Sequence, residues 1–282
     1  MKLVEALAFA KDQLAQAGVP SPEADSYWLL AHALQTSKAE LLTSLTLGLE
    51  LTPAQLTQFK LDLENRTKRV PLQHITGASG FRKLELKVGP GVFIPRYETE
   101  QIAQIAIDLI SSSSELLRVV DVGTGSGAIA IAIATETNAE VYAIEADTIA
   151  AEYARENIEA NQANVALLLG RFEQELPKLN NLDLIVSNPP YIPISAVPLE
   201  PEVRDFDPEL ALYSGDDGLD AIRELIALSP ISLRIGGSLI LEHADGQSDS
   251  VRELLLTSGY GDVLAHPDAT GKLRAVSAVR RS

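Results

Sequence analysis

The chain of 282 residues contains no cysteine, which excludes disulfide bonds and metal sites built on thiolates. Its four histidines stand singly, and we expect no metal site. No apolar run approaches the roughly 20 residues that span a bilayer. The N-terminal MKLVEALAFAKDQ is broken by charges where a signal peptide has a continuous apolar centre. These features predict a cytoplasmic protein with no membrane partner.

Positive charge is also scarce, because 23 lysines and arginines stand against 39 aspartates and glutamates, for a formal net charge of -16. Non-specific affinity for nucleic acid comes largely from basic residues that neutralise phosphates. A local basic patch remains open, but the balance argues against a direct nucleic-acid partner. It favours a small molecule or a protein that presents basic residues.

The first seventy residues have the pattern of a small helical domain. Leu3, Leu7, Ala10 and Leu14 recur at helical spacing, and Ser37 with Glu40 and Thr52 with Gln55 fit capping boxes that open two further helices. This domain lacks clustered reactive side chains, so we expect it to dock a substrate. Residues 71–95 contain glycine pairs and a partly alternating segment, which predicts a β-hairpin linker.

From residue 96 onward, after one further helix, apolar runs alternate with helical patterns. Buried strands separated by helices predict an α/β domain with a mostly parallel sheet over 96–282. The last two strands lie close together, which suits an antiparallel edge. The expected strands are Arg118–Val122, Glu140–Glu145, Ala166–Leu169, Leu182–Ser187, Ser238–His243, Asp262–His266 and Ala275–Val279, and the expected helices are Ala128–Thr135, Ile149–Asn161, Gly218–Ser229 and Ser248–Ser258.

A glycine-rich loop follows the first of these strands. Gly123, Thr124, Gly125, Ser126 and Gly127 lie between strand and helix, where glycines let backbone amides approach a ligand. The second strand ends in an acid about 20 residues further on, at a position that can accept both ribose hydroxyls. The loop and the acid suit both a nicotinamide dinucleotide and S-adenosylmethionine. The alternative is that they bind no ligand, the loop being only a tight turn and the acid being solvated.

The stretch IVSNPPY ends the fourth expected strand. The side-chain carbonyl of Asn188 and the backbone carbonyl of Pro189 can accept hydrogen bonds from a planar NH2 group. Pro189 and Pro190 fix the backbone and remove competing donors, and the ring of Tyr191 can pack on the planar group. This motif therefore predicts a methyl acceptor with a planar amine or amide.

The glycine loop followed by Asn-Pro-Pro-Tyr resembles the S-adenosylmethionine-dependent amino-methyltransferases. With IPRYETE (Ile94–Glu100) and PLQHITG (Pro71–Gly77) behind a helical domain, the whole chain resembles the release factor glutamine methyltransferase family, the protein-(glutamine-N5) methyltransferases. The resemblance implies a class I S-adenosylmethionine-dependent methyltransferase fold, Rossmann-like, with a mostly parallel seven-stranded sheet and a small N-terminal helical domain.

The resemblance also implies a reaction and a partner. Methyl passes from S-adenosyl-L-methionine to the side-chain amide nitrogen of the glutamine in the Gly-Gly-Gln motif of peptide chain release factors, of the release factor 1 or 2 type. Asn188, Pro189, Pro190 and Tyr191 then form the catalytic site. Residues 123–127 and Glu145 bind the methionine and ribose parts of the cofactor, Phe172 flanks its adenine, and Asn188 also contacts it.

Four positions depart from the family's usual pattern. Arg171 stands where an acid is common, Glu145 replaces an aspartate, Tyr97 occupies a usual proline position, and Ala244 replaces a glycine. Arg96 and Glu98 either border the site or tie the linker to the sheet.

Other functions share parts of this pattern. An adenine-N6 nucleic-acid methyltransferase would grip its acceptor in the same way, and a sibling enzyme would methylate a glutamine of a ribosomal protein. A catalytically idle binding module also remains open, whereas a dehydrogenase would leave the Asn-Pro-Pro-Tyr motif without a purpose.

Overall fold

The computed structural model describes residues 1–282, which form two compact units. Unit 1 comprises Met1–Ala78 with Pro198–Phe206, and unit 2 comprises Ser79–Val197 with Asp207–Ser282. None of the helices combines the length and apolar character needed to cross a membrane. The predicted domain limits at residues 70 and 95 stay a prediction.

Unit 1 is helical, and its helices bury leucines, alanines and Phe59 in a core of their own. Both predicted capping boxes are present, because Ser37 accepts a hydrogen bond from the backbone of Glu40 and Thr52 accepts one from that of Gln55. The helices are α1 (Leu3–Gln16), α2 (Pro22–Leu34), α3 (Lys38–Thr46), α4 (Pro53–Thr67), α5 (Leu72–Thr76) and α10 (Pro201–Phe206).

Helix α5 is a feature that the sequence interpretation missed, since its residues were assigned to the hairpin linker. Pro71 is its N-cap, and Gly77 ends it in the left-handed conformation at a φ of 74°. These are the usual signals of a helix start and stop. The helix has only five residues, too few for a periodic pattern to reveal it.

A largely buried ionic cluster holds α10 within unit 1. Arg66 donates to Asp25 at 2.7 Å and to Glu202 of α10 at 2.8 Å, and Arg69 donates to both oxygens of Glu202 at 2.7 and 2.6 Å. Burial alone raises the pKa of Glu202, but hydrogen bonds from Arg69 and Arg66 lower it to about 2. The segment 198–206 therefore belongs to the helical unit through charge pairing as well as packing.

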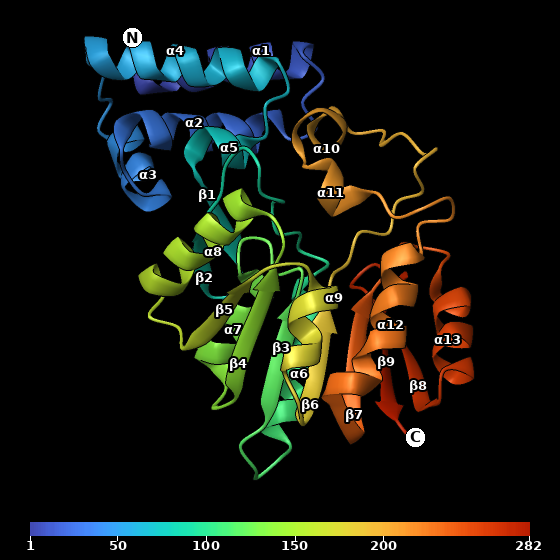
Figure 1. The fold of residues 1–282 in the computed structure, drawn as a ribbon. Helices are drawn as coiled ribbons and strands as arrows, with labels where there is room; N and C mark the ends of the chain where they lie inside the picture. The colour runs from blue at the N-terminus through green and yellow to red at the C-terminus, as the bar shows by residue number, and fades with distance from the viewer. The chain divides into compact units, whose positions relative to one another are not determined.

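Unit 2 is built on a seven-stranded sheet with the order β5-β4-β3-β6-β7-β9-β8 (Figure 1). The first five of these strands are parallel, and β9 pairs antiparallel with both β7 and β8. The predicted mostly parallel sheet and its antiparallel edge are confirmed. The strands are β3 (Arg118–Val122), β4 (Glu140–Glu145), β5 (Val165–Leu169), β6 (Leu182–Ser187), β7 (Leu233–Glu242), β8 (Tyr260–Pro267) and β9 (Leu273–Arg280).

Two apolar layers cover the sheet. Helices α6 and α7 pack on one face with β3, β4 and β6, and α12 and α13 pack on the other face with β6, β7 and β9. Helix α7 is buried along its whole run from Ala128 to Ile133, because its AIAIAIA sequence offers only apolar side chains. The helices are α6 (Glu100–Ser111), α7 (Ala128–Glu136), α8 (Thr148–Ala160), α9 (Phe172–Glu175), α11 (Glu209–Leu212), α12 (Asp220–Ser232) and α13 (Ser248–Thr257), with a 3-10 turn at Leu176–Lys178.

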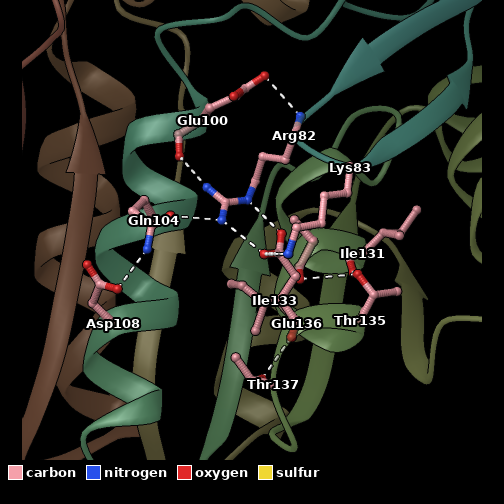
Figure 2. Close-up of polar contacts among 11 residues, drawn as sticks. Arg82, Lys83, Glu100, Gln104, Asp108, Ile131, Ile133, Thr135, Glu136 and Thr137 are labelled. Atoms are coloured by element: carbon pink, nitrogen blue, oxygen red, sulfur yellow. Dashed lines mark hydrogen bonds and ion pairs between the residues drawn. The ribbon is translucent and has the colours of Figure 1, made fainter.

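The predicted hairpin is formed by β1 (Ala78–Phe81) and β2 (Leu84–Lys87). Arg82 at its turn pairs with both oxygens of Glu136 at the end of α7, at 2.7 and 3.1 Å, and also donates to Gln104 of α6 at 2.8 Å (Figure 2). Its backbone amide donates to Glu100 at 2.9 Å. One arginine thus ties the hairpin turn to the helices on this face of the sheet.

Replacing Arg82 with alanine should lower the free energy of unfolding by about 2–3 kcal/mol, because Glu136 would keep its charge in a largely buried place without its partner. Lys83 is the matched control: it contacts the same carboxylate at 3.2 Å, but its side chain is 81% exposed. We expect Lys83→Ala to cost less than about 1 kcal/mol. Urea unfolding followed by circular dichroism compares the two, and equal losses would contradict this role of Arg82.

Candidate active site

The candidate site lies where several parallel strands of unit 2 end together. Val122 of β3 pairs with Ile144 of β4 and with Ser187 of β6, and Ser187 pairs with Leu241 of β7. The chain order reverses between β3 and β6, which makes this edge a topological switch point where α/β sheets bind ligands. The glycine loop follows β3, Glu145 is the last residue of β4, and Asn188 follows β6.

A buried aspartate braces the glycine loop. Asp121 is fully buried and accepts hydrogen bonds from the Thr124 hydroxyl at 2.5 Å and from the Ala130 amide at 3.2 Å. Burial raises the pKa of Asp121 to about 7, although the bond from Thr124 opposes this rise. Asp121 therefore supports the glycine loop from inside the protein.

The three glycines of the loop have different surroundings. Gly123 and Gly125 have φ values of +72° and +58°, and a Cβ at either would meet no atom within 4 Å. A Cβ at Gly127 would lie 2.9 Å from Ile131, so this glycine allows α7 to pack closely. The loop therefore presents bare backbone to open space at Gly123 and Gly125, as a cradle for a ligand requires.

The side chains of Thr124 and Ser126 are turned into the protein. Both residues are buried, and the Thr124 hydroxyl is already bonded to Asp121. Asn157 of α8, also buried, donates to the Ser126 carbonyl at 2.9 Å and exchanges hydrogen bonds with the backbone of Lys87. Their predicted part in cofactor binding thus falls to the backbone, and it stays a prediction.

Glu145 is held at the end of β4 by the loop itself. Its two carboxylate oxygens accept hydrogen bonds from the amides of Gly125 at 2.7 Å and Asp147 at 2.9 Å. A carboxylate has about four lone-pair sites, so Glu145 can still accept a hydrogen bond from a ribose hydroxyl. Burial raises the pKa of Glu145, against the lowering effect of the bonds from Asp147 and Gly125.

The predicted adenine neighbour, Phe172, begins α9 after β5. It is partly buried and packs against the core on the α12 and α13 face. Both interpretations of this residue, as a cofactor contact and as a core aromatic, therefore stay open. Arg171 beside it is exposed and pairs with Glu173. As an arginine, it has no carboxylate that could accept a hydrogen bond from the adenine amine.

Asn188 follows β6 with its side chain in a fixed orientation. Its Nδ2 donates to the hydroxyl of Thr99 at 3.2 Å. No group of the protein donates to the Asn188 Oδ1 or to the Pro189 carbonyl. Two acceptors are thus left for a ligand where the sequence places a planar NH2 group.

Tyr191 is fixed at both ends. Its hydroxyl donates to Glu242 Oε1 at the end of β7 at 3.3 Å, and its carbonyl accepts from Gln247 at 3.0 Å. Burial raises the pKa of the Tyr191 hydroxyl, with the charge of Glu242 adding to the shift. The predicted packing of its ring on a planar acceptor stays a prediction.

Arg96 is held by contacts within unit 2, and its two predicted roles stay predictions. It pairs with the buried Asp207 at 2.5 Å and stacks on Phe93 at 5.0 Å from the ring centre. Asp207 directly follows the Pro198–Phe206 segment of unit 1. Arg96 therefore anchors the chain that leads back from this segment into unit 2.

Full-length relatives decide the family. The chain is 41% identical over 281 residues to the release factor glutamine methyltransferase of Streptomyces coelicolor, covering 98% of this chain and 97% of the relative. It is 36% identical over 293 residues to that of Bifidobacterium longum, with 99% and 100% covered. The chain belongs to the release factor glutamine methyltransferase family. Two family models also match, the PrmC N-terminal domain at residues 5–77 and ribosomal protein L11 methyltransferase (PrmA) at residues 96–196.

Solved structures are similar in fold. A methyltransferase from Pyrococcus furiosus aligns with a TM-score of 0.55 at 21% identity, covering 78% of this chain and 100% of that one. The 16S rRNA N2 G1207 methyltransferase of T. thermophilus, solved with AdoMet and guanosine, aligns at 0.52 and 20% identity, covering 72% and 50%. The fold is that of class I S-adenosylmethionine-dependent methyltransferases, and S-adenosyl-L-methionine is the cofactor.

The departures from the family pattern cause no visible strain. Ala244 has a negative φ, so its position does not demand a glycine, and its amide donates to Gln247 at 2.8 Å. Tyr97 is 74% exposed, where its size meets no limit.

Three residues of this site were not identified from the sequence: Thr99, Glu242 and Gln247. Thr99 directly precedes α6, Glu242 ends β7 and Gln247 lies in the loop after β7, all far from Asn188 along the chain. The charged Glu242 at the end of the apolar run SLIL was a signal in the sequence, since an acid ending a buried strand lies at the ligand edge of the sheet.

Gly218 allows the Tyr191 carbonyl to approach, and alanine there should disturb the site. Its φ is +79°, and a Cβ would lie 2.2 Å from the Tyr191 oxygen. We expect Gly218→Ala to lower kcat by up to about 10²-fold, because small displacements at a reacting centre are costly. Gly246→Ala is the control: its φ is +88°, but a Cβ there meets no atom within 4 Å. Equal kcat values for the two variants would contradict this prediction.

Proposed function

We propose that the protein transfers a methyl group from S-adenosyl-L-methionine to the side-chain amide nitrogen of the glutamine in the Gly-Gly-Gln motif of peptide chain release factors. The observation that carries this proposal is the pair of open acceptors, Asn188 Oδ1 and the Pro189 carbonyl, beside an oriented Tyr191. The family of the chain supports the acceptor being a glutamine amide.

The cofactor fits the residues at this sheet edge. The bare backbone at Gly123 and Gly125 leaves room for its methionine part, and Glu145 keeps lone pairs for its ribose. When bound, it supplies an electrophilic methyl group on a positively charged sulfur. We propose that residues 123–127, Glu145, Phe172 and Asn188 hold it.

The chain's part in the reaction is orientation. An amide nitrogen is a poor nucleophile, because its lone pair is delocalised into the carbonyl. Asn188 and Pro189 accept its two hydrogens and so hold the nitrogen in line for attack. The same acceptors stabilise the positive charge that develops on this nitrogen. Pro189 and Pro190 keep both acceptors in place. No strong general base is required, since the attack first gives a cationic N-methylated amide, which is a strong acid and loses its extra proton readily.

The helical unit is proposed to dock the release factor. Its side chains include no reactive cluster, and the chain passes from Tyr191 into its segment Pro198–Phe206 after only six residues, 192–197. The pairing of Glu202 with Arg66 and Arg69 supports this arrangement. The unit proposed to dock the substrate would thereby be joined to the Asn-Pro-Pro-Tyr motif by one short segment of the chain. The net charge of -16 suits a partner with basic residues and disfavours a direct nucleic-acid partner.

The test compares acceptors under one set of conditions. Purified protein with methyl-radiolabelled S-adenosylmethionine should label release factors 1 and 2, and a Gln→Ala change in their Gly-Gly-Gln motif should abolish the label. Ribosomal proteins and duplex DNA serve as rival acceptors in parallel reactions. Label that persists on the altered factor, or that appears only on a rival acceptor, would contradict the proposal.

A further inference from the structure

A buried polar cluster lies behind the proposed acceptor site. Glu242 ends β7 with 3% of its surface exposed, and Thr99 precedes α6 with 4% exposed. The Tyr191 hydroxyl donates to Glu242 Oε1 at 3.3 Å, and the Thr99 hydroxyl interacts with the same carboxyl and lowers its pKa. Glu242 Oε2 is buried without a hydrogen-bond partner of good geometry. Burying a carboxyl without full hydrogen bonding costs free energy of folding. The orientation of the acceptor amide by Asn188 and Pro189 does not by itself explain why Glu242 is buried here.

The cluster reaches Asn188 through Thr99. A hydroxyl has one hydrogen to donate and lone pairs with which to accept. If the hydrogen of Thr99 faces Glu242, its lone pair is left for the Asn188 Nδ2, which donates to it at 3.2 Å. An amide held by its nitrogen cannot turn over, so its oxygen stays directed away from Thr99.

We propose that Glu242 and Thr99 are positioning residues for methyl transfer: Glu242 orients the hydroxyls of Thr99 and Tyr191, and Thr99 fixes the Asn188 amide with its oxygen toward the acceptor. The proposal rests on the proposed function for its reaction. It assigns neither residue a contact with substrate or cofactor. Without Thr99, the Asn188 amide could turn over and direct its Nδ2 toward the acceptor in a fraction of the molecules. The NH2 groups of Asn188 and of the acceptor amide would then face each other.

The charges around Glu242 predict a pH dependence. The pKa of Glu242 is raised to about 7, mainly by burial, and the charge of Glu98 adds to this rise. The hydroxyls of Thr99 and Tyr191 and the charge of Arg274 of β9 oppose it. His243 follows Glu242 in the chain, with a pKa lowered by burial. A protonated Glu242 would donate to Thr99 in competition with the Asn188 amide. The kcat should therefore fall as pH drops through about 7, and this acidic limb should be weaker in Glu242→Gln.

The kinetic test uses the intact protein with a full-length release factor. Thr99→Val removes the hydroxyl at nearly constant shape, and we expect kcat to fall about 10–10²-fold, with KM and the Kd for S-adenosylmethionine changed less than about threefold. Thr99→Ser should restore kcat to near that of the unaltered protein. Thr135→Val, which removes a hydroxyl bonded only within α7, should leave kcat unchanged. A Thr99→Val enzyme with unaltered kcat, or a Thr99→Ser enzyme equally slow, would overturn the proposal.

A second measurement needs no methyl acceptor. The side-chain NH2 of Asn188, followed by NMR in 15N-labelled protein, should exchange slowly with water in the unaltered and Thr99→Ser proteins and faster in Thr99→Val and Glu242→Gln. Equal exchange in all four would overturn the positioning role. If the unaltered protein fails to methylate release factors but shows these differences, the proposed function fails and the positioning of Asn188 stands. Circular dichroism confirms that each variant is folded.

Discussion

Replacement of Asn188 by alanine is expected to lower kcat for methyl transfer by about 10²–10³-fold, the loss typical of removing one aimed polar group from an active site. The side-chain oxygen of Asn188 accepts no hydrogen bond within the protein, so it is available to the acceptor nitrogen. The Kd for S-adenosylmethionine should rise by less than about tenfold, since Gly123, Gly125 and Glu145 remain in place. Steady-state kinetics and calorimetric titration measure the two quantities separately.

The control for this variant is Asn138→Ala. Asn138 is exposed and lies between α7 and the start of β4, at the opposite edge of the sheet from Asn188, and its loss should change neither quantity. Equal losses in kcat and in cofactor affinity for Asn188→Ala would show that Asn188 serves mainly the cofactor, contrary to the proposed orientation of the acceptor.

Replacement of Glu145 by glutamine should have the largest effect on the cofactor, weakening S-adenosylmethionine binding by about 10–10²-fold. Glutamine keeps the size of the side chain, but its NH2 would face one of two backbone amides, Gly125 or Asp147, that now donate to the carboxylate. A buried donor without an acceptor costs about 1–3 kcal/mol. Calorimetric titration with S-adenosylmethionine measures this effect, and an unchanged Kd would contradict the role of Glu145.

Binding should also depend on pH through the same carboxyl. Burial raises the pKa of Glu145, so its proton is retained to higher pH than in an exposed glutamate, and a protonated carboxyl accepts fewer hydrogen bonds. Affinity should therefore increase as pH rises through this raised pKa, and Glu145→Gln should lose that part of the dependence. Residual changes near pH 7 are expected from Asp121 and Glu242, whose pKa values are both raised to about 7. Glu159→Gln on the exposed side of α8 is the control.

Most of the sheet could be predicted because each of its strands is a short apolar run that is recognisable in the local sequence. Leu182–Ser187 matches β6 in both bounds, and the polar stretch after it marks the ligand edge. The bounds were less accurate where local signals conflict with packing. Helix α12 continues to Ser232 although Pro230 lies in its last turn, and β7 begins at Leu233, well before the expected Ser238.

The positions of Thr99 and Glu242 next to the Asn-Pro-Pro-Tyr motif could not be predicted in the same way. The motif Asn-Pro-Pro-Tyr identifies its own residues, but Thr99 and Glu242 meet Asn188 and Tyr191 only through the sheet order β3-β6-β7 and the packing of α6. Nothing in the local sequence states which threonine lies beneath an asparagine 89 positions later. The grouping of Pro198–Phe206 with the helical unit is equally non-local, since it depends on Glu202 meeting Arg66 and Arg69.

Methylation of a release-factor glutamine is tested by locating the transferred methyl group. A release factor is incubated with the protein and S-adenosylmethionine carrying a deuterated methyl, then digested and sequenced by tandem mass spectrometry. If Asn188 orients a release-factor glutamine, the label lies on the side-chain amide of the glutamine in the Gly-Gly-Gln peptide, and its amount is strongly reduced with Asn188→Ala. Label on any other side chain, or an undiminished amount with Asn188→Ala, would contradict the proposed function.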